Sequence, residues 1–471
     1  MTNRIEHDLL GDETLPDNAW YGIQTLRALR NFNITGVPIH HFYDLINTLA
    51  MVKEASAEAN HELGILSSKK TNAIRQACMR IREGELHNQF VVDLIQGGAG
   101  TSTNMNANEV IANLSLSIMG HEKGEYQYLH PNNDVNKSQS TNDAYPTAAR
   151  LAIVLSTQTL IYALSSIKKS LEKKSEEFSG ILKMGRTQLQ DAVPMTLGQE
   201  FKAFAVTLGE DIQRIEETSK LLCEVNLGGT AIGTGINTHK DYAKSAISHL
   251  ARISSLPVVA AEHLIEATSD MGAFVSMSSI QKRLAIKLSK ICNDLRLLSS
   301  GPRAGFNEIN LPAMQAGSSI MPGKVNPVIP EAVNQTAFQV IGHDLTVTMA
   351  AEAGQLQLNA MEPVIIYNIL NSMKMLSSAI YMLDHRCIRG ITANKEHCHH
   401  QVKDSIGMIT ALVPYIGYDN ASRIARNALL SRSTVGELIL KESLLDAATL
   451  DRLMSPQAML NPMETPYEAA I

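Results

Sequence analysis

The chain carries the run Gly317-Ser318-Ser319-Ile320-Met321-Pro322-Gly323-Lys324-Val325-Asn326-Pro327 between long segments of helical periodicity. Two glycines and two prolines exclude a helix interior or a central strand, so a loop is expected here. The loop holds two hydroxyls, one ammonium and one carboxamide between glycine joints, and such a segment can close over an anion and exclude water. A plain surface turn is the alternative on composition alone, because most Gly, Pro and Ser clusters are only turns.

The spacing of this loop argues against a nucleotide-phosphate loop. That motif needs four residues between its glycines and a Ser or Thr after the Lys. Here five residues separate Gly317 from Gly323, and Val325 follows Lys324. The hydroxyl that would hold magnesium is missing, so the NTPase interpretation is set aside.

The rest of the chain predicts a mainly helical, all-α protein. Aromatic residues make up only 5% of the 471 residues while Met occurs 20 times, and few aromatics among many Ala, Leu, Ile and Met favour helices over sheets. Leu160, Leu164, Ile167 and Leu171 form one apolar helix stripe. Several long segments are apolar or small on most faces, which is typical of helices buried in a bundle. These segments lie near 145–178, 197–225, 262–300, 331–360 and 363–394.

The length is enough for about three domains. We expect a mostly helical N-terminal domain with an irregular start over 1–141 and a central long-helix bundle over 142–395. A small helical C-terminal domain is expected over 396–471.

Charge and composition exclude several classes of partner. The formal net charge is −6 and there is no long basic run, so electrostatics do not favour binding to nucleic acid or to an anionic membrane. No stretch is expected to reach the length and purity of a membrane span. Five scattered cysteines favour a reducing compartment, and the N-terminus lacks the apolar core of a signal peptide. A cytoplasmic location is therefore expected.

Three further polar stretches interrupt the periodic segments. The run 96–109 leads from three glycines through Thr101 and Ser102 to a helix predicted to start near Asn106, and N–H groups at such a start suit a carboxylate. The run 130–143 contains Ser140-Thr141-Asn142-Asp143, for which helix capping alone is the alternative to ligand binding. The third is the short polar break 184–194, which includes Thr187 and Gln188.

Three other motifs give weaker indications of function. His397-Cys398-His399-His400 could suggest a metal site, but adjacent ligands on one helix point to different faces and no second ligand group is obvious, so no metal is predicted. The glycine-rich run 228–235 lacks the preceding strand and third glycine of a dinucleotide site. Paired short helices after residue 394 lack the basic recognition face of a DNA-binding domain.

The four polar loops, together with Asn18-Ala19-Trp20-Tyr21-Gly22-Ile23-Gln24-Thr25, resemble the active-site segments of the aspartase/fumarase superfamily of lyases. Members of that family eliminate ammonia, water or a larger amine to give fumarate. The resemblance implies a helical core shared by four subunits, with each active site built from three chains. It also implies a small-molecule substrate. An organic cofactor, a nucleotide or a metal is not required by it.

The resemblance also implies a role for each residue of the loops. It makes Ser318 the base, whose alkoxide would need backbone N–H groups and desolvation on loop closure. Gly317 and Gly323 are suitable hinges for that closure. For the carboxylate that becomes an aci-carboxylate, the resemblance implies binding by Thr101, Ser140, Thr141 and Ser319. The other carboxylate would be bound by Lys324 and Asn326. The leaving amine would be bound by Asn142 and Thr187.

Three functions are compatible with this resemblance: an ammonia-lyase acting on L-aspartate, a class II fumarate hydratase, and a catalytically silent structural protein on the same fold. Retention of the polar residues disfavours the third. Gln188 stands where fumarases have His; it cannot titrate but can bind a carboxylate or an ammonium, which favours aspartate and a carbon–nitrogen lyase. Ser102, Thr141 and 328–330 also follow aspartases, whereas 228–230 follows fumarases. Arg30 departs from aspartases, which have an acid there.

Overall fold

The structure is a computed structural model that describes residues 3–431, 433–455, 458 and 460. Its contacts divide the chain into two compact units, each assembled from separate stretches of sequence. Unit 1 comprises Met1–Tyr162, Asp211–Ile286 and Thr336–Ser377, and unit 2 comprises Ala163–Glu210, Lys287–Gln335 and Ser378–Ile471. This partition follows contacts and not chain order, and the three-domain division at residues 141 and 395 stays a prediction.

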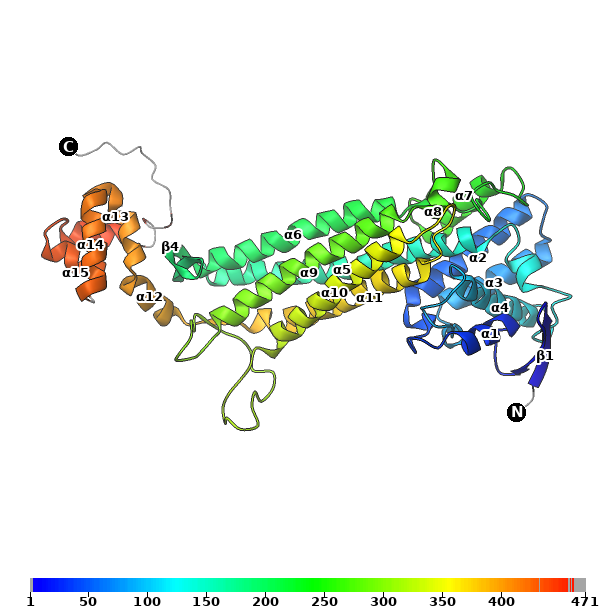
Figure 1. Cartoon of the computed structure of the whole chain (residues 1–471), viewed down its shortest axis with the longest axis horizontal. Coiled ribbons are helices and arrows are strands. Elements are labelled where there is room, and N and C mark those ends of the chain that lie inside the picture. Colours follow the sequence, from blue (N-terminus) through cyan, green and yellow to red (C-terminus); the bar gives the residue numbers. More distant parts are fainter. Residues whose placement is uncertain (1–2, 432, 456–457, 459, 461–471) are drawn as a thin grey trace. The chain divides into compact units, whose positions relative to one another are not determined.

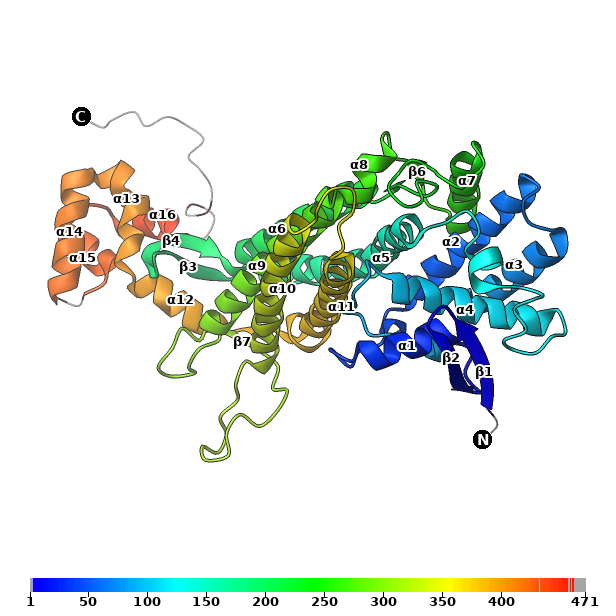
Figure 2. The ribbon, with the colours of Figure 1, turned by 45° about the vertical axis from the view of Figure 1, so that its right-hand side comes forward.

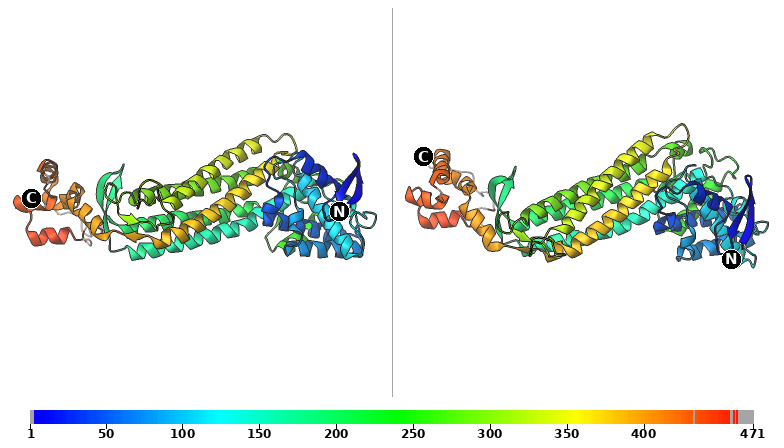
Figure 3. Two further views of the ribbon diagram at one scale, coloured as in Figure 1. Left: turned by 90° about the horizontal axis from the view of Figure 1, so that it is seen from below. Right: turned by 60° about the horizontal axis from the view of Figure 1, so that its bottom comes forward.

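Five long helices confirm the mainly helical fold, and Figures 1 and 3 show them running side by side. Each begins in one unit and ends in the other. They are α5 (Thr141–Glu177), α6 (Leu197–Leu221), α9 (Gly272–Leu298), α10 (Val328–Glu352) and α11 (Glu362–Arg386). The segment predicted as one helix over 262–300 is broken at Asp270 and Met271, which separate the short α8 (Leu264–Ser269) from α9.

Helix α5 corrects one expectation from the sequence. It contains an 18-residue window of mean hydropathy 1.3, so by length and composition it is apolar enough to cross a membrane. Half of that window is buried inside the protein, and core helices of soluble bundles pass the same test. Helices of this kind are apolar on most faces because several neighbours cover them.

In unit 1 the two most buried helices lie beneath the loops considered below. Helices α2 and α4 have buried side chains over most of their length, polar ones included. The elements of this unit, apart from the long helices, are β1 (Asn3–Asp8), β2 (Gly11–Pro16), α1 (Ile23–Asn31), α2 (Tyr43–Glu62), α3 (Ser68–Arg82), α4 (Thr101–Ile118), β5 (Glu224–Val225), α7 (Tyr242–Ser254), β6 (Val259–Ala260) and α8 (Leu264–Ser269), with single turns at Ile39–His41, His87–Gln89 and Pro131–Val135.

The start of the chain is more regular than predicted. Strands β1 and β2 form an antiparallel hairpin, with Asp8 paired to Gly11, and α1 follows. Alternation of charged residues with single apolar ones, as at Leu15, hides this strand signal. Arg30, the departure noted from the sequence, forms an ion pair of 2.8 Å with Glu13 on β2. Its role in the structure is therefore to hold α1 against the hairpin.

Unit 2 carries a hairpin and a small group of C-terminal helices. Its elements outside the long helices are β3 (Leu182–Thr187), β4 (Gln190–Thr196), β7 (Ile309–Asn310), β8 (Thr392–Ala393), α12 (Lys395–Asp404), α13 (Ile409–Ile416), α14 (Tyr418–Ser431), α15 (Val435–Lys441) and α16 (Ala447–Leu453), with single turns at Ile388–Gly390 and Ile406–Met408. The last four helices enclose a core that includes Leu412, Ile424 and Ile439, all fully buried. Each such side chain contributes roughly 1.5–3 kcal/mol on burial.

Candidate active site

The loop 317–327 is closed at its base by its own backbone. The N–H of Gly317 donates to the carbonyl of Lys324 at 2.8 Å, and Asn326 Nδ2 donates to the carbonyl of Gly317 at 2.7 Å. A Cβ at Gly317 would lie 2.5 Å from the Lys324 oxygen, so only glycine fits there. Gly323 has a φ of +80°, which favours glycine at the far end of the loop.

The hydroxyl of Ser318 faces two backbone N–H donors of its own loop. Its Oγ accepts the backbone N–H groups of Met321 at 2.9 Å and Ile320 at 3.2 Å. Two N–H groups directed at one oxygen stabilise negative charge on it and lower the cost of forming an alkoxide. The side chains of Ser319 and Lys324 are exposed on the same loop, and Ser318 and Asn326 are half-buried.

In unit 1 the glycine-rich turn leads directly into α4. The helix begins at Thr101, five residues before the predicted start, which puts Thr101 and Ser102 in its first turn. A Cβ at Gly100 would lie 2.3 Å from the ring of Tyr145 on α5, so this glycine allows the turn and α5 to meet. Thr101 Oγ1 donates to the carbonyl of Gly98 at 2.7 Å, so its hydroxyl must rotate to donate to a carboxylate.

The second polar loop both caps a helix and presents a donor. Helix α5 begins at Thr141, with Ser140 immediately before it, and the N–H of Asn142 donates to Ser140 Oγ at 3.2 Å. Asp143 returns the contact by accepting the N–H of Ser140 at 2.9 Å, a reciprocal capping arrangement. Ser140 Oγ acts as an acceptor in this cap and keeps its own hydrogen. Capping and ligand binding are therefore compatible at this residue.

Asp143 joins this loop to the glycine-rich run 228–235. Its other oxygen, Oδ2, accepts the N–H groups of Gly228 and Thr230, each at 3.0 Å. The carboxyl group is fully buried, and burial raises its pKa while these N–H donors oppose that change. A residue that sequence analysis placed only in a helix cap therefore holds two loops together.

Asn142 also contacts the run 228–235 through its side chain and the neighbouring Asn226 through its carbonyl, which a proline in α5 frees for another donor. Pro146 lies inside α5 and has no N–H, so the helix leaves the carbonyl of Asn142 without its usual donor. Asn226 Nδ2 supplies one at 3.0 Å, and Asn142 Nδ2 donates to the carbonyl of Ala231 at 2.7 Å.

A small cavity of about 200 Å³ opens between these two loops. Three of its lining residues, Ser138, Thr230 and Asn237, have φ between 56° and 66°, an uncommon conformation for non-glycine residues that is concentrated at functional sites. The cavity is large enough for a small dicarboxylate end group together with water. Its lining residues are Ser138, Gln139, Ser140, Thr230, Ala231, Ile236 and Asn237.

Thr187 and Gln188 occupy the tip of the β3–β4 hairpin of unit 2, which the sequence indicated only as a polar break. Thr187 pairs with Gln190 across a two-residue turn, and both turn residues, Gln188 and Leu189, have positive φ. The side chains of Thr187 and Gln188 are exposed there. In Figures 1 and 2 the 311–327 loop extends away from the long helices, whereas the hairpin packs against α12 and the turn Ile406–Met408, where Ser405 Oγ donates to Asp191 Oδ2 at 2.8 Å.

The hairpin is anchored below its tip by buried charges. Glu308, fully buried, forms an ion pair of 2.7 Å with Lys183 and a second ion pair with Arg186, both on β3. The guanidinium of Arg186 also lies 4.3 Å from the centre of the Phe306 ring. Such buried pairs fix orientation even where their net contribution to stability is small.

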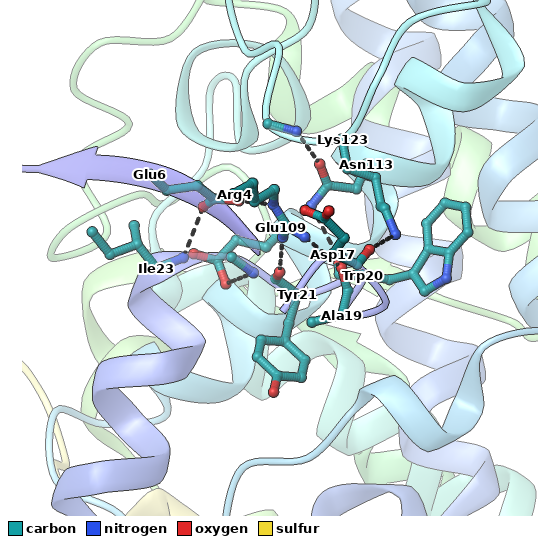
Figure 4. A network of polar contacts seen from close by, with 12 residues as sticks. Arg4, Glu6, Asp17, Ala19, Trp20, Tyr21, Ile23, Glu109, Asn113 and Lys123 are labelled. Carbon is teal, nitrogen blue, oxygen red and sulfur yellow. Dashed lines mark hydrogen bonds and ion pairs between the residues drawn. The ribbon is translucent and has the colours of Figure 1, made fainter. Parts of the chain in front are cut away.

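The N-terminal segment 17–25 is also held in place, as Figure 4 shows. Arg4 donates to the carbonyls of Pro16, Ala19 and Tyr21 at 2.6–3.2 Å. Glu109, on α4, accepts four hydrogen bonds from this segment: the N–H groups of Gly22, Gln24 and Thr25, and the Thr25 hydroxyl. The segment that resembled a site-approaching element is thus fixed to the helix that begins at Thr101.

The His397–His400 cluster contributes to packing. Cys398 is buried, with its Sγ 3.6 Å from the carbonyl of Glu308, and His397 Nε2 contacts the carbonyl of Phe306 at 2.9 Å. His399 and His400 are exposed. Within the described ranges, no group of three or more His, Cys, Asp or Glu side chains is placed to hold a metal ion.

The predicted site residues thus fall into two sets. Thr101, Ser140, Thr141 and Asn142 lie in unit 1, on the two helix starts that meet at Gly100 and Tyr145. Unit 2 carries the others, which are Thr187, Gln188, Ser318, Ser319, Lys324 and Asn326. The sequence did not single out Lys53 and Asn104, which are linked to Thr141 of the first set by hydrogen bonds. The available signal was one lysine in the otherwise uncharged run 45–53 of a buried helix.

Comparison with known proteins gives the family. A model described as "Lyase" matches residues 11–342, and one described as "Fumarase C C-terminus" matches residues 408–461. The chain belongs to this lyase family. The resemblance inferred from the loops is therefore confirmed.

Three members of the lyase family illustrate the likeness. A relative from Pseudomonas aeruginosa, named aspartate ammonia-lyase, is 62% identical over 469 residues, which is 99% of both chains. A solved structure named fumarate lyase:delta crystallin from Brucella melitensis, bound to cobalt, has a TM-score of 0.96 and 56% identity, covering 98% of this chain and 100% of that one. Recombinant class II fumarase from Schistosoma mansoni has a TM-score of 0.92 at 34% identity, covering 97% and 99%. The fold class is confirmed by these two structures.

Proposed function

We propose that this lyase is an aspartate ammonia-lyase, a carbon–nitrogen lyase that converts L-aspartate reversibly to fumarate and ammonia. The observation that carries the proposal is the full-length identity of 62% with a protein of that name, against 34% with a class II fumarase. Gln188 agrees with this choice: the ammonium of aspartate leaves as ammonia without a general acid, whereas expulsion of hydroxide from malate needs a proton.

The chemistry proposed for the loops follows from their donors. Ser318 as alkoxide removes a proton from Cβ, and the electrons of the broken C–H bond move into the adjacent carboxylate to give a dianionic aci-carboxylate. Donors around that group stabilise it. The C–N bond then breaks, the electrons return to form the double bond of fumarate, and ammonia departs. We assign the donors to Thr101, Ser140, Thr141 and Ser319.

The remaining residues orient the substrate. The second carboxylate is assigned to Lys324 and Asn326, and the leaving amine to Asn142 and Thr187. In the structure Asn326 Nδ2 donates to Gly317, so its Nδ2 has one hydrogen left for the substrate. The proposed steps use these side chains and backbone donors alone, so the proposal includes neither an organic cofactor nor a metal.

A homotetramer with shared active sites is part of the proposal, and an exposed apolar stripe supports it. On α10, Phe338, Leu345 and Met349 are each more than 60% exposed and recur at i, i+7 and i+11, the spacing of one helix face. Large exposed apolar stripes mark association surfaces. Association through the long helices would bring loops of different chains together. A cytoplasmic location is proposed with it.

The deciding experiment follows fumarate by ultraviolet absorbance with the purified protein and either L-aspartate or L-malate. We expect turnover of aspartate and little or none of malate. A kcat/KM for malate equal to or above that for aspartate assigns the protein as a fumarase. A folded protein that turns over neither would be a structural protein on this fold.

A further inference from the structure

A buried lysine lies beneath the loops of unit 1 that carry the candidate carboxylate-binding residues. Lys53, on α2, has no exposed surface, and its ammonium donates to three side-chain amide oxygens. The acceptors are Asn104 Oδ1 at 2.6 Å, Gln139 Oε1 at 2.8 Å and Asn136 Oδ1 at 2.9 Å. Burial lowers the pKa of Lys53 to about 7, and the Asp143 carboxylate opposes that change. Below that pH the side chain is an ammonium with three donors and no acceptor, which matches its three amide-oxygen partners.

The ammonium decides which way the Asn104 amide faces. Because the charged form of Lys53 can only donate, the oxygen of Asn104 points towards it and the nitrogen points away. That nitrogen, Nδ2, lies 3.1 Å from Thr141 Oγ1 and 3.2 Å from Asn136 Oδ1. Asn136 Oδ1 is itself an acceptor facing Lys53, so both contacts of Nδ2 are donations by Asn104.

This contact in turn directs the hydrogen of Thr141. A threonine hydroxyl has one hydrogen and two lone pairs. With a lone pair of Oγ1 occupied by Asn104, the hydroxyl hydrogen remains for another acceptor. Thr141 is the first residue of α5 and is half-buried beside Ser140. A carboxylate can only accept, so it needs this hydrogen.

We propose that Lys53 and Asn104 are positioning residues that set the Thr141 hydroxyl as a donor to the substrate carboxylate. The inference rests on the proposed function, because it concerns the carboxylate that becomes the aci-carboxylate. Negative charge on that group increases in the transition state, so a donor fixed in advance is worth more there than in the substrate complex. Its loss should lower kcat more than it raises KM.

The test is Asn104→Asp, which keeps the shape and the oxygen facing Lys53 but replaces the donor by an acceptor. Thr141 must then donate to Asp and turn its hydrogen away from the substrate. We expect kcat with aspartate to fall about 10- to 100-fold, the effect of one donor to a charged group, with KM changed about threefold or less. Asn108→Asp is the control: it makes the same change one turn along α4, at a residue whose Nδ2 contacts Met105 and Asn136 but not Thr141. Measured per folded enzyme, its kcat should stay within about threefold of wild type, because the Asn108 amide has no contact with Thr141.

A double-mutant cycle separates positioning from general damage. Thr141→Val removes the hydroxyl, so adding Asn104→Asp to that variant should lower kcat little further. If Asn104→Asp acted on the fold alone, the two losses of kcat would multiply. If the Asp variant fails to assemble, Asn104→Ala runs the same cycle without adding a charge. Wild-type turnover of aspartate, measured first, tests the proposed function by itself. On an active enzyme, multiplicative losses, or an Asn104 variant with wild-type kcat, would overturn the positioning role.

Discussion

The backbone N–H of Met321 donates to Ser318 Oγ at 2.9 Å, so the proposed base lies three residues from one of its own stabilising donors. The loop thus makes an anion site for its own side chain, a concave turn of N–H groups of the kind that binds anions elsewhere. This arrangement explains why an ordinary serine could be used as a base here.

Ser318→Ala should abolish elimination while fold and assembly remain intact, because the half-buried hydroxyl hydrogen-bonds to loop N–H groups alone among the residues that the structure describes. We expect kcat to fall by at least roughly two orders of magnitude. Ile320→Ala is the matched control, since its side chain is 82% exposed and only its backbone N–H contacts Ser318. A Ser318→Ala enzyme with more than about a tenth of wild-type kcat would mean that another group is the base.

Gly317→Ala should disable the loop without unfolding the protein. The new Cβ would lie 2.5 Å from the Lys324 carbonyl oxygen and 2.9 Å from the Asn326 nitrogen, so the pairing that closes the loop must open. We expect kcat/KM to fall about 100-fold or more, since small misplacements of catalytic groups are costly. Gly180→Ala, at a glycine with open space around its Cβ position, should leave activity unchanged. Equal effects in the two variants, measured with aspartate, would contradict this role of Gly317.

Sequence patterns predicted most of the fold because the long helices have unmistakable periodicity. The misses have physical causes. The β1–β2 hairpin has a mostly charged sequence, with Leu15 as its one fully buried apolar side chain, so its alternation is weak. Helix α4 was expected near Asn106 because Thr101 and Ser102 favour caps and turns, yet the αL conformation of Gly100 starts the helix directly after it.

The site was predictable only where residues are consecutive in sequence. The loop around Ser318 stands out by its composition. In contrast, Lys53 lies 51 residues from Asn104 and acts on Thr141 through it. No local pattern reports such a relay, because it depends on how α2, α4 and the start of α5 pack together.

Assembly should fail when the apolar stripe of α10 is charged. Leu345→Glu places a carboxylate at a side chain that is 62% exposed in the single chain, so the chain itself should fold. If that face is an interface, the carboxylate would be buried against apolar groups and the subunits would separate. Sedimentation at matched concentrations should show smaller species, with activity lost in parallel. Leu430→Glu, at a 76% exposed residue of α14, is the control that should keep both. An active monomer would refute shared active sites.

The last prediction concerns the pH dependence of stability. Burial raises the pKa of Glu109 to about 7, with the nearby Glu6 carboxylate acting in the same direction and the Thr25, Gln24 and Gly22 donors opposing it. A carboxyl group with a raised pKa in the folded state binds its proton more tightly there than in the unfolded chain. Its contribution to stability is therefore complete below the unfolded pKa of about 4.5 and is lost as pH rises through about 7. The loss amounts to roughly 3 kcal/mol.

Glu109→Gln isolates this contribution, because the amide is neutral at every pH. The variant should be less stable overall, since its NH₂ group faces N–H donors. However, the gap in thermal midpoint between wild type and variant should narrow from pH 5 to pH 7.5, because only the wild type loses stability at Glu109 as pH rises. Midpoints are compared at one protein concentration, since an assembly unfolds at a concentration-dependent temperature. Glu83→Gln, at an exposed residue of the same charge, should give no such change. A gap for Glu109→Gln that is constant or widens over this range would show that Glu109 is ionised throughout.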